Sequence, residues 1–129
     1  MKILLVRPKS HGTFGVTRFV NVEPLELEYL SSICKEEGHV DEIYDGSMDR
    51  RRFEDKYRDF SFDAVAISGY INSVDIIKKY AQYIKEKNKH TKVIVGGVVA
   101  EVVPELLYSQ NIDIIVHSGG FQPFRELLR

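Results

Sequence analysis

Residues 64–73, AVAISGYINS, read as a buried strand that ends in a turn of small residues and leads into a helix. The apolar run from Ala64 to Ile67 does not alternate with polar residues, which is typical of a parallel strand covered on both faces. Asn72 or Ser73 is placed to cap the next helix. The apolar residues of that helix recur at helical spacing: Ile77, Tyr80, Ala81 and Ile84. The turn therefore lies at the carboxyl end of a central strand.

The rest of the chain alternates strand and helix in the same way. Four other strands are predicted at Ile3–Val6, Val40–Tyr44, Val93–Val95 and Ile112–Val116. The other helices are predicted from Pro24 to near Gly38, from Asp49 to about Phe60, from Pro104 onward and from Phe121 to Arg129. This alternation predicts a single α/β domain over residues 1–129. Its sheet is expected to be doubly wound and flavodoxin-like (Rossmann-like), with five parallel strands in the order 2-1-3-4-5 and helices on both faces, giving three layers.

Composition limits the classes of function. The chain has 129 residues, of which 43% are hydrophobic and 29% charged, as expected for one soluble domain. A net charge of −1 gives no overall attraction to nucleic acid or to an anionic membrane, so neither is predicted as a partner. The single cysteine, Cys34, leaves no internal disulfide and too few thiolates for a zinc or iron–sulfur site within this chain. No apolar run approaches the roughly 20 residues of a spanning helix, and a cytoplasmic protein is expected.

Small residues follow several of the predicted strands. Ligands of open α/β sheets bind at the carboxyl ends of the strands, which makes Ser68, Gly69 and Tyr70 the first candidates for a site. The loops expected to gather along this edge are residues 7–15, 68–72, 96–97 and 118–121. Together they predict a slot lined by backbone amides and hydroxyls, which suits a large ligand with a phosphate-bearing tail.

The order of these elements resembles a known family. Ser68-Gly69-Tyr70 and, after a gap of 25 residues, Gly96-Gly97 resemble the Ser-x-Leu and Gly-Gly elements of the cobalamin-binding domain. Residues 24–30 (PLELEYL), then Gly38-His39 and Asp45-Gly46, resemble the amino-terminal cobalamin-binding domain of radical S-adenosylmethionine enzymes. The likeness extends over nearly the whole chain.

This resemblance implies a role for each matching position. Ser68 would hydrogen-bond near the base of the cobalamin nucleotide tail, Gly69 would allow close backbone approach, and Gly96 and Gly97 would leave room for the tail. Tyr70 and Ile71 would pack beside the corrin. The cofactor-binding residues that the resemblance and the strand ends imply are Ser10, His11, Ser68, Gly69, Tyr70, Ile71, Gly96, Gly97, Ser118, Gly119, Gly120 and Phe121. No catalytic residue and no metal ligand is predicted.

The chain also departs from the family pattern. Residues 118–120 (SGG) stand where the family usually has Gly-Glu-Gly-Glu, so two acidic residues are missing. In cobalamin domains of the methionine synthase type, a histidine within Asp-x-His-x-x-Gly coordinates cobalt. Here His11 is preceded by Lys9 and followed by Phe14 at the Asp and Gly positions, so no lower histidine ligand is expected.

The resemblance implies chemistry that this chain cannot perform alone. A radical S-adenosylmethionine enzyme holds its 4Fe-4S cluster with Cys-x-x-x-Cys-x-x-Cys, and only Cys34 is present here. The cluster and S-adenosylmethionine are therefore expected in a downstream domain, which would be the partner of this one. The chain is interpreted as the amino-terminal part, or a detached domain, of a methyltransferase or a related oxidoreductase.

Three other interpretations were weighed. A phosphorelay receiver needs acidic residues at strand ends that here carry Arg7-Pro8 and Ser68-Gly69, and a Lys where His117-Ser118 stands, which excludes that class. A flavodoxin needs a hydroxyl-rich phosphate loop, of which residues 10–13 are a thin version. A flavodoxin-like interaction or regulatory domain that binds no cofactor remains the alternative. Residues 50–52 (RRR) and the lysines at 78 and 79 read as solvated helix faces.

Overall fold

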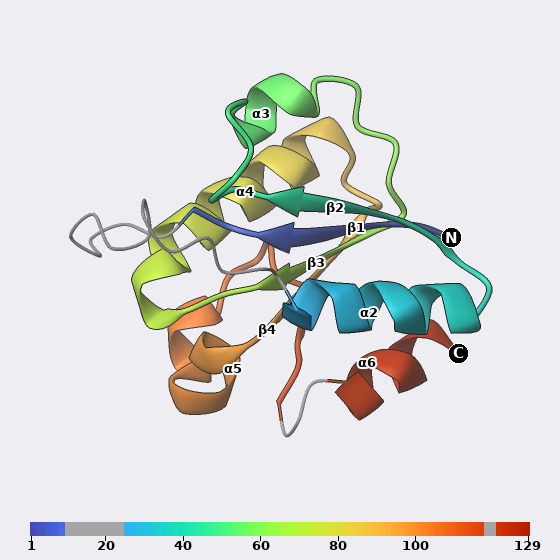
Figure 1. The fold of residues 1–129 in the computed structure, drawn as a ribbon. Coiled ribbons are helices and arrows are strands. Elements are labelled where there is room, and N and C mark those ends of the chain that lie inside the picture. The colour runs from blue at the N-terminus through green and yellow to red at the C-terminus, as the bar shows by residue number, and fades with distance from the viewer. Residues whose placement is uncertain (10–24, 118–120) are drawn as a thin grey trace.

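Strand β1 (Lys2–Arg7) lies between β2 (Val40–Asp45) and β3 (Ala64–Ser68) in a parallel sheet. Strands β4 (Lys92–Gly96) and β5 (Ile114–Ile115) extend it, so that the order is β2-β1-β3-β4-β5. The structure is a computed structural model that describes residues 1–9, 25–117 and 121–129 (Figure 1). The observed strand order confirms the predicted doubly wound topology.

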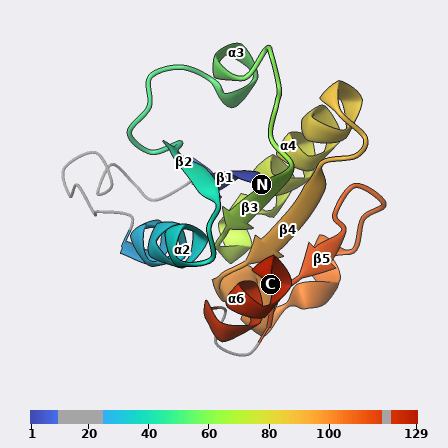
Figure 2. The ribbon, with the colours of Figure 1, turned by 90° about the vertical axis from the view of Figure 1, so that its right-hand side faces the viewer.

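Helices cover both faces of the sheet (Figures 1 and 2). One layer contains α2 (Leu25–Glu36) and α6 (Phe121–Leu128), and the other contains α3 (Phe53–Lys56) and α4 (Val74–Lys87). The side chains of β1 alternate between two buried clusters, Ile3 and Leu5 on the α2 side and Leu4 and Val6 on the α4 side. All four are fully buried, which explains why the strand carries no polar alternation.

Helix α4 has the predicted apolar face, but Ser73, one of the two predicted capping residues, makes no side-chain capping bond. Ile77, Tyr80, Ala81 and Ile84 are all buried against the sheet. Ser73 occupies the N-cap position without a side-chain capping bond, because a 3-10 turn (η1, Ile71–Ser73) precedes the helix and gives Ser73 helical rather than extended dihedral angles. Among the described residues, its buried hydroxyl has no hydrogen-bond partner.

The helix predicted from Asp49 to Phe60 is wrong in length, because α3 contains only four residues. The Asp49 carboxylate instead accepts hydrogen bonds from the Arg51 N–H at 2.9 Å and from Lys56 Nζ at 2.9 Å. The Tyr44 hydroxyl donates to the Arg51 carbonyl at 2.9 Å. These bonds hold residues 49–52 in a loop, and the aromatic spacing that suggested a helix reflects a ring cluster around Phe53.

The last third of the chain holds shorter elements than predicted. A five-residue helix, α5 (Val98–Val102), follows β4 and was not predicted, since its valines favour strands over helices. Pro104 begins a 3-10 turn, η2 (Pro104–Leu107). Only Ile114 and Ile115 of the predicted fifth strand pair with β4, opposite Ile94 and Val95.

Candidate functional site

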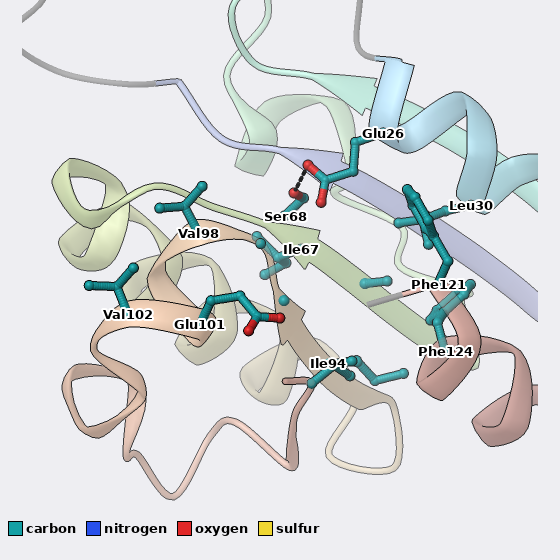
Figure 3. A pocket seen from close by; sticks show the side chains of 14 residues that line it. Glu26, Leu30, Ile67, Ser68, Ile94, Val98, Glu101, Val102, Phe121 and Phe124 are labelled. Atoms are coloured by element: carbon teal, nitrogen blue, oxygen red, sulfur yellow. Dashed lines mark hydrogen bonds between the residues drawn. The ribbon is translucent and has the colours of Figure 1, made fainter. Parts of the chain in front are cut away.

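A slot of about 450 Å³ opens at the carboxyl ends of β3 and β4 (Figure 3). Its walls come from the first turns of α2, from α5 and from the start of α6, and its floor from the sheet. The residues that line it are Glu26, Leu30, Ala66, Ile67, Ser68, Ile94, Gly96, Gly97, Val98, Glu101, Val102, Val116, Phe121 and Phe124. Most of these side chains are apolar, so the slot suits a ligand with a large nonpolar surface.

Small residues on the strands create the space. Ala66 lies on the floor, and Gly96 ends β4 beside Ser68. A Cβ at Gly96 would meet Val116 only at 3.8 Å, an ordinary contact distance, so this position opens toward free space. A large side chain at Gly96 would therefore enter the slot without displacing backbone.

Polar groups at the slot come from three elements. The Ser68 hydroxyl at the end of β3 donates a hydrogen bond to Glu26 Oε2 of α2 at 2.6 Å. Glu101 of α5 lies on the opposite wall (Figure 3). Carboxylates accept hydrogen bonds, so Glu26 and Glu101 favour donor groups of a ligand, such as hydroxyl or amide N–H groups.

Two glycines join the loops behind the slot. The Gly69 N–H donates to the Gly96 carbonyl at 3.2 Å, and the Val99 N–H donates to the Gly69 carbonyl at 3.2 Å. Gly97 has a φ of +89°, which lies in the left-handed region that residues with a Cβ rarely adopt. The ends of β3 and β4 are thus held in direct backbone contact.

The structure places the predicted site residues in three groups. Ser68, Gly96, Gly97 and Phe121 line the slot. Gly69 packs behind it against Ile77, while Tyr70 and Ile71 are 56% and 50% exposed after the end of β3. The remaining candidates lie outside the described residues: Ser10, His11, Ser118, Gly119 and Gly120.

Several lining residues were not predicted. Leu30 and Phe124 lie within predicted helices, and nothing in those helices indicated a cavity. Glu26 lies within the segment of residues 24–30 that resembled the family, but nothing in that segment indicated a contact with Ser68, 42 residues away. Glu101 and Val102 belong to the helix that the sequence did not predict.

Among residues 1–9, 25–117 and 121–129, no three His, Cys, Asp or Glu side chains form a group able to hold a metal ion. Within the same residues, every helix is too short or too polar to cross a lipid bilayer.

The doubly wound sheet and the apolar slot at its carboxyl edge define a ligand-binding domain of the flavodoxin-like class. A family model of the B12-binding domain matches residues 13–128. The chain therefore belongs to the B12-binding domain family, whose ligand is vitamin B12, or cobalamin. It is also 31% identical, over 99% of its length, to the uncharacterized methyltransferase PH0819 of Pyrococcus horikoshii. This chain spans 29% of the length of that relative.

Proposed function

We propose that this chain is the cobalamin-binding part of a larger radical S-adenosylmethionine enzyme that transfers methyl groups or performs a related oxidation–reduction. Membership of the B12-binding family supports the cofactor. A relative that is named as a methyltransferase and is more than three times as long supports a larger enzyme. The resemblance of residues 24–30 to the amino-terminal domain of radical S-adenosylmethionine enzymes supports the class.

The observation that carries the proposal is the slot at the ends of β3 and β4. Its volume of about 450 Å³ falls within the range of roughly 300 to 1,000 Å³ typical of ligand pockets. The nucleotide tail of cobalamin would enter beside Gly96 and Ala66, with Leu30 and Phe124 packed against its base. Ser68 and Glu26 would supply hydrogen bonds to its polar groups.

Exposed apolar residues near the slot fit the corrin ring. Tyr70, Ile71 and Val98 are 56%, 50% and 44% exposed at the carboxyl edge of the sheet, and a flat ligand lying across this edge would cover them. When bound, the cobalt of the corrin would supply a carrier for a methyl group. This chain would bind and orient the cofactor, and a downstream domain would hold the iron–sulfur cluster and S-adenosylmethionine.

A titration with hydroxocobalamin tests the proposal. The purified chain should retain the corrin through gel filtration, with the colour eluting together with the protein. Gly96→Leu should abolish retention, because its side chain would fill the slot without meeting backbone. Gln82→Leu, which adds the same side chain at an exposed position of α4, should retain the corrin.

Failure to retain hydroxocobalamin would contradict the proposal. If neither this chain nor a longer chain with the downstream domain retains hydroxocobalamin, the cofactor role is wrong. The carboxyl edge would then be a surface that packs against another domain, as in the interaction module considered above.

A further inference from the structure

A second cavity, of about 220 Å³, lies between the loop after β2, α3 and α4. It shares no lining residue with the cobalamin slot. Helices α3 and α4 cover the face of the sheet opposite to α2 and α6 (Figure 1), so the two cavities are formed by different layers.

Positive charge is concentrated at this second cavity. Its cationic lining residues are Lys9, Arg50, Arg51, Arg52 and Lys79, and its acidic ones are Asp49 and Glu54. Five cations against two carboxylates give a formal charge of +3, in a chain whose net charge is −1. The arginines belong to the loop of residues 49–52 that replaces the predicted helix, and the side chains of Arg51 and Arg52 are 64% and 76% exposed at the mouth of the cavity.

The nearby carboxylates leave much of this charge uncompensated. Asp49 is paired most closely with Lys56, at 2.9 Å, which lies outside the cavity lining, and more loosely with Arg51, at 3.4 Å. Among the described residues, the Glu54 carboxylate forms an ion pair with Arg52 alone, at 3.8 Å. Within the described residues, Arg50, Lys79 and Lys9 form no ion pair. Three cations from separate segments therefore line the cavity without an ion-pair partner among the described residues.

The backbone that carries the arginines is fixed by other groups. The Tyr44 hydroxyl donates to the Arg51 carbonyl at 2.9 Å, and the Asp49 carboxylate accepts the Arg51 N–H at 2.9 Å. Beneath the loop, Phe53 stacks on Tyr80 with ring centroids 4.4 Å apart. The Tyr44 hydroxyl and the Asp49 carboxylate thus hold the loop, and Arg51 Nε adds a weaker contact with Asp49 at 3.4 Å. The buried rings below the loop reduce the local dielectric constant and strengthen electrostatic attraction.

We infer that this cavity binds an anion that carries phosphoryl groups. Arginine presents a planar fork of donors that matches phosphoryl oxygens, and lysine adds a compact positive charge. A volume of about 220 Å³ is smaller than the roughly 300 to 1,000 Å³ of typical ligand pockets, so the cavity suits phosphate or diphosphate and not a whole nucleotide. The anion is either free in solution or a terminal group of a larger molecule that projects outward.

Calorimetric titration of the chain with inorganic phosphate, inorganic diphosphate and ADP tests this site. The titration is run at low ionic strength, because salt screens exposed charges. Diphosphate should bind more tightly than phosphate, owing to its higher charge. Equal binding of diphosphate and ADP would indicate a terminal group of a larger molecule, and binding of inorganic diphosphate alone would indicate a free anion. Amide shifts in nuclear magnetic resonance spectra should localise to Gly46 and residues 50–52.

Matched double variants distinguish binding in this cavity from attraction of the anion to the overall charge of the chain. Arg50→Gln with Lys79→Gln should weaken diphosphate binding by about tenfold or more, since two charge-assisted contacts are lost. Arg58→Gln with Lys78→Gln removes the same charge from exposed residues outside the cavity and should leave the affinity unchanged. Gly96→Leu should also retain diphosphate, which distinguishes this site from the cobalamin slot.

Two outcomes overturn the proposal. The first is equal weakening in both double variants, because it would show attraction to overall charge only. The second is the absence of saturable binding of all three anions to the unaltered chain. In either case the basic residues would form a surface for an acidic protein partner.

Discussion

Gly97 and Gly69 lie back to back where β4 and β3 leave the sheet: a Cβ on Gly97 would lie 2.9 Å from both the nitrogen and the oxygen of Gly69. Atoms of a real side chain do not approach backbone this closely, so the two loops can meet only if position 97 is glycine. Gly97 and Ser68 both line the slot, so this contact joins the two strand ends that form it.

Gly97→Ala should lower the free energy of unfolding by about 2 to 4 kcal/mol, from a strained dihedral angle together with a forced backbone shift. Gly38→Ala is the matched control, because Gly38 has a φ of +82° with no heavy atom within 4 Å of the added Cβ. That variant should lose only about 1 kcal/mol. Urea denaturation of both variants measures the difference, and equal losses would contradict the contact described above.

Phe124 of α6 both packs in the hydrophobic core and lines the slot. It is 3% exposed and packs in the cluster that includes Leu27 and Leu30. Phe124→Ala should cost about 3 to 5 kcal/mol, since a buried aromatic ring is lost. Leu127→Ala, on the same helix at a site that is 41% exposed, should cost less than about 1 kcal/mol.

Urea denaturation and amide hydrogen exchange of α6 test this pair of variants. Exchange in α6 should quicken in Phe124→Ala and not in Leu127→Ala. Similar stability losses in the two variants would mean that α6 does not depend on the Phe124 contact. Helix α6 would then be held mainly by the Arg125 ion pairs with Glu36 and Glu37, at 2.7 and 3.2 Å.

Sequence reasoning predicted the sheet well because its inner strands are buried on both faces. Strands β1, β3 and β4 each carry an apolar run without alternation, and such runs have few other stable arrangements in a chain that alternates with helices. The sequence-based prediction was wrong for the length of the helix near residues 53–60. Phe53, Tyr57 and Phe60 have helical spacing, but their rings pack with one another and with Tyr44, and the Asp49 side chain replaces helical hydrogen bonds.

The candidate site was predictable only where it lies at strand ends. Ser68, Gly96 and Gly97 follow strands directly, so topology alone places them at one edge. Glu26 and Glu101 belong to helices, and their position in the slot depends on how α2 and α5 pack on the sheet. Tertiary packing of this kind leaves no local pattern in the sequence.

Asp49 should make the stability of the domain sensitive to acid. Hydrogen bonds from Lys56 Nζ and from the Arg51 N–H lower the pKa of this carboxyl from 3.8 to about 2. Because the pKa is lower in the folded state, Asp49 stabilises the fold fully above about pH 4, and this contribution is lost as the pH falls through about 2.

Asp49→Asn tests this dependence. The variant should be less stable than the unaltered chain at neutral pH, and the difference should shrink between pH 4 and pH 2, the range that the two pKa values define. Asp59→Asn is the control, because Asp59 is exposed and makes no hydrogen bond or ion pair among the described residues. Urea midpoints across this pH range provide the measurement. A constant difference at every pH would show that Asp49 acts through its shape and not its charge.

Cys34 should react with thiol reagents only when the domain opens. The side chain is fully buried, and burial, aided by the charge of Asp41, raises the pKa of the thiol from 9.0 to about 11. Since the thiolate is the reactive form, the raised pKa alone reduces reactivity at pH 8 by about 100-fold, and burial reduces it further. Labelling with Ellman's reagent should therefore be slow for the folded chain and fast in urea. Because Cys34 lies on the buried face of α2, in the same cluster as Phe124, the same assay should report faster labelling in Phe124→Ala than in Leu127→Ala. Labelling of the folded chain as fast as that of the unfolded chain would show that the face of α2 that carries Cys34 is open to solvent.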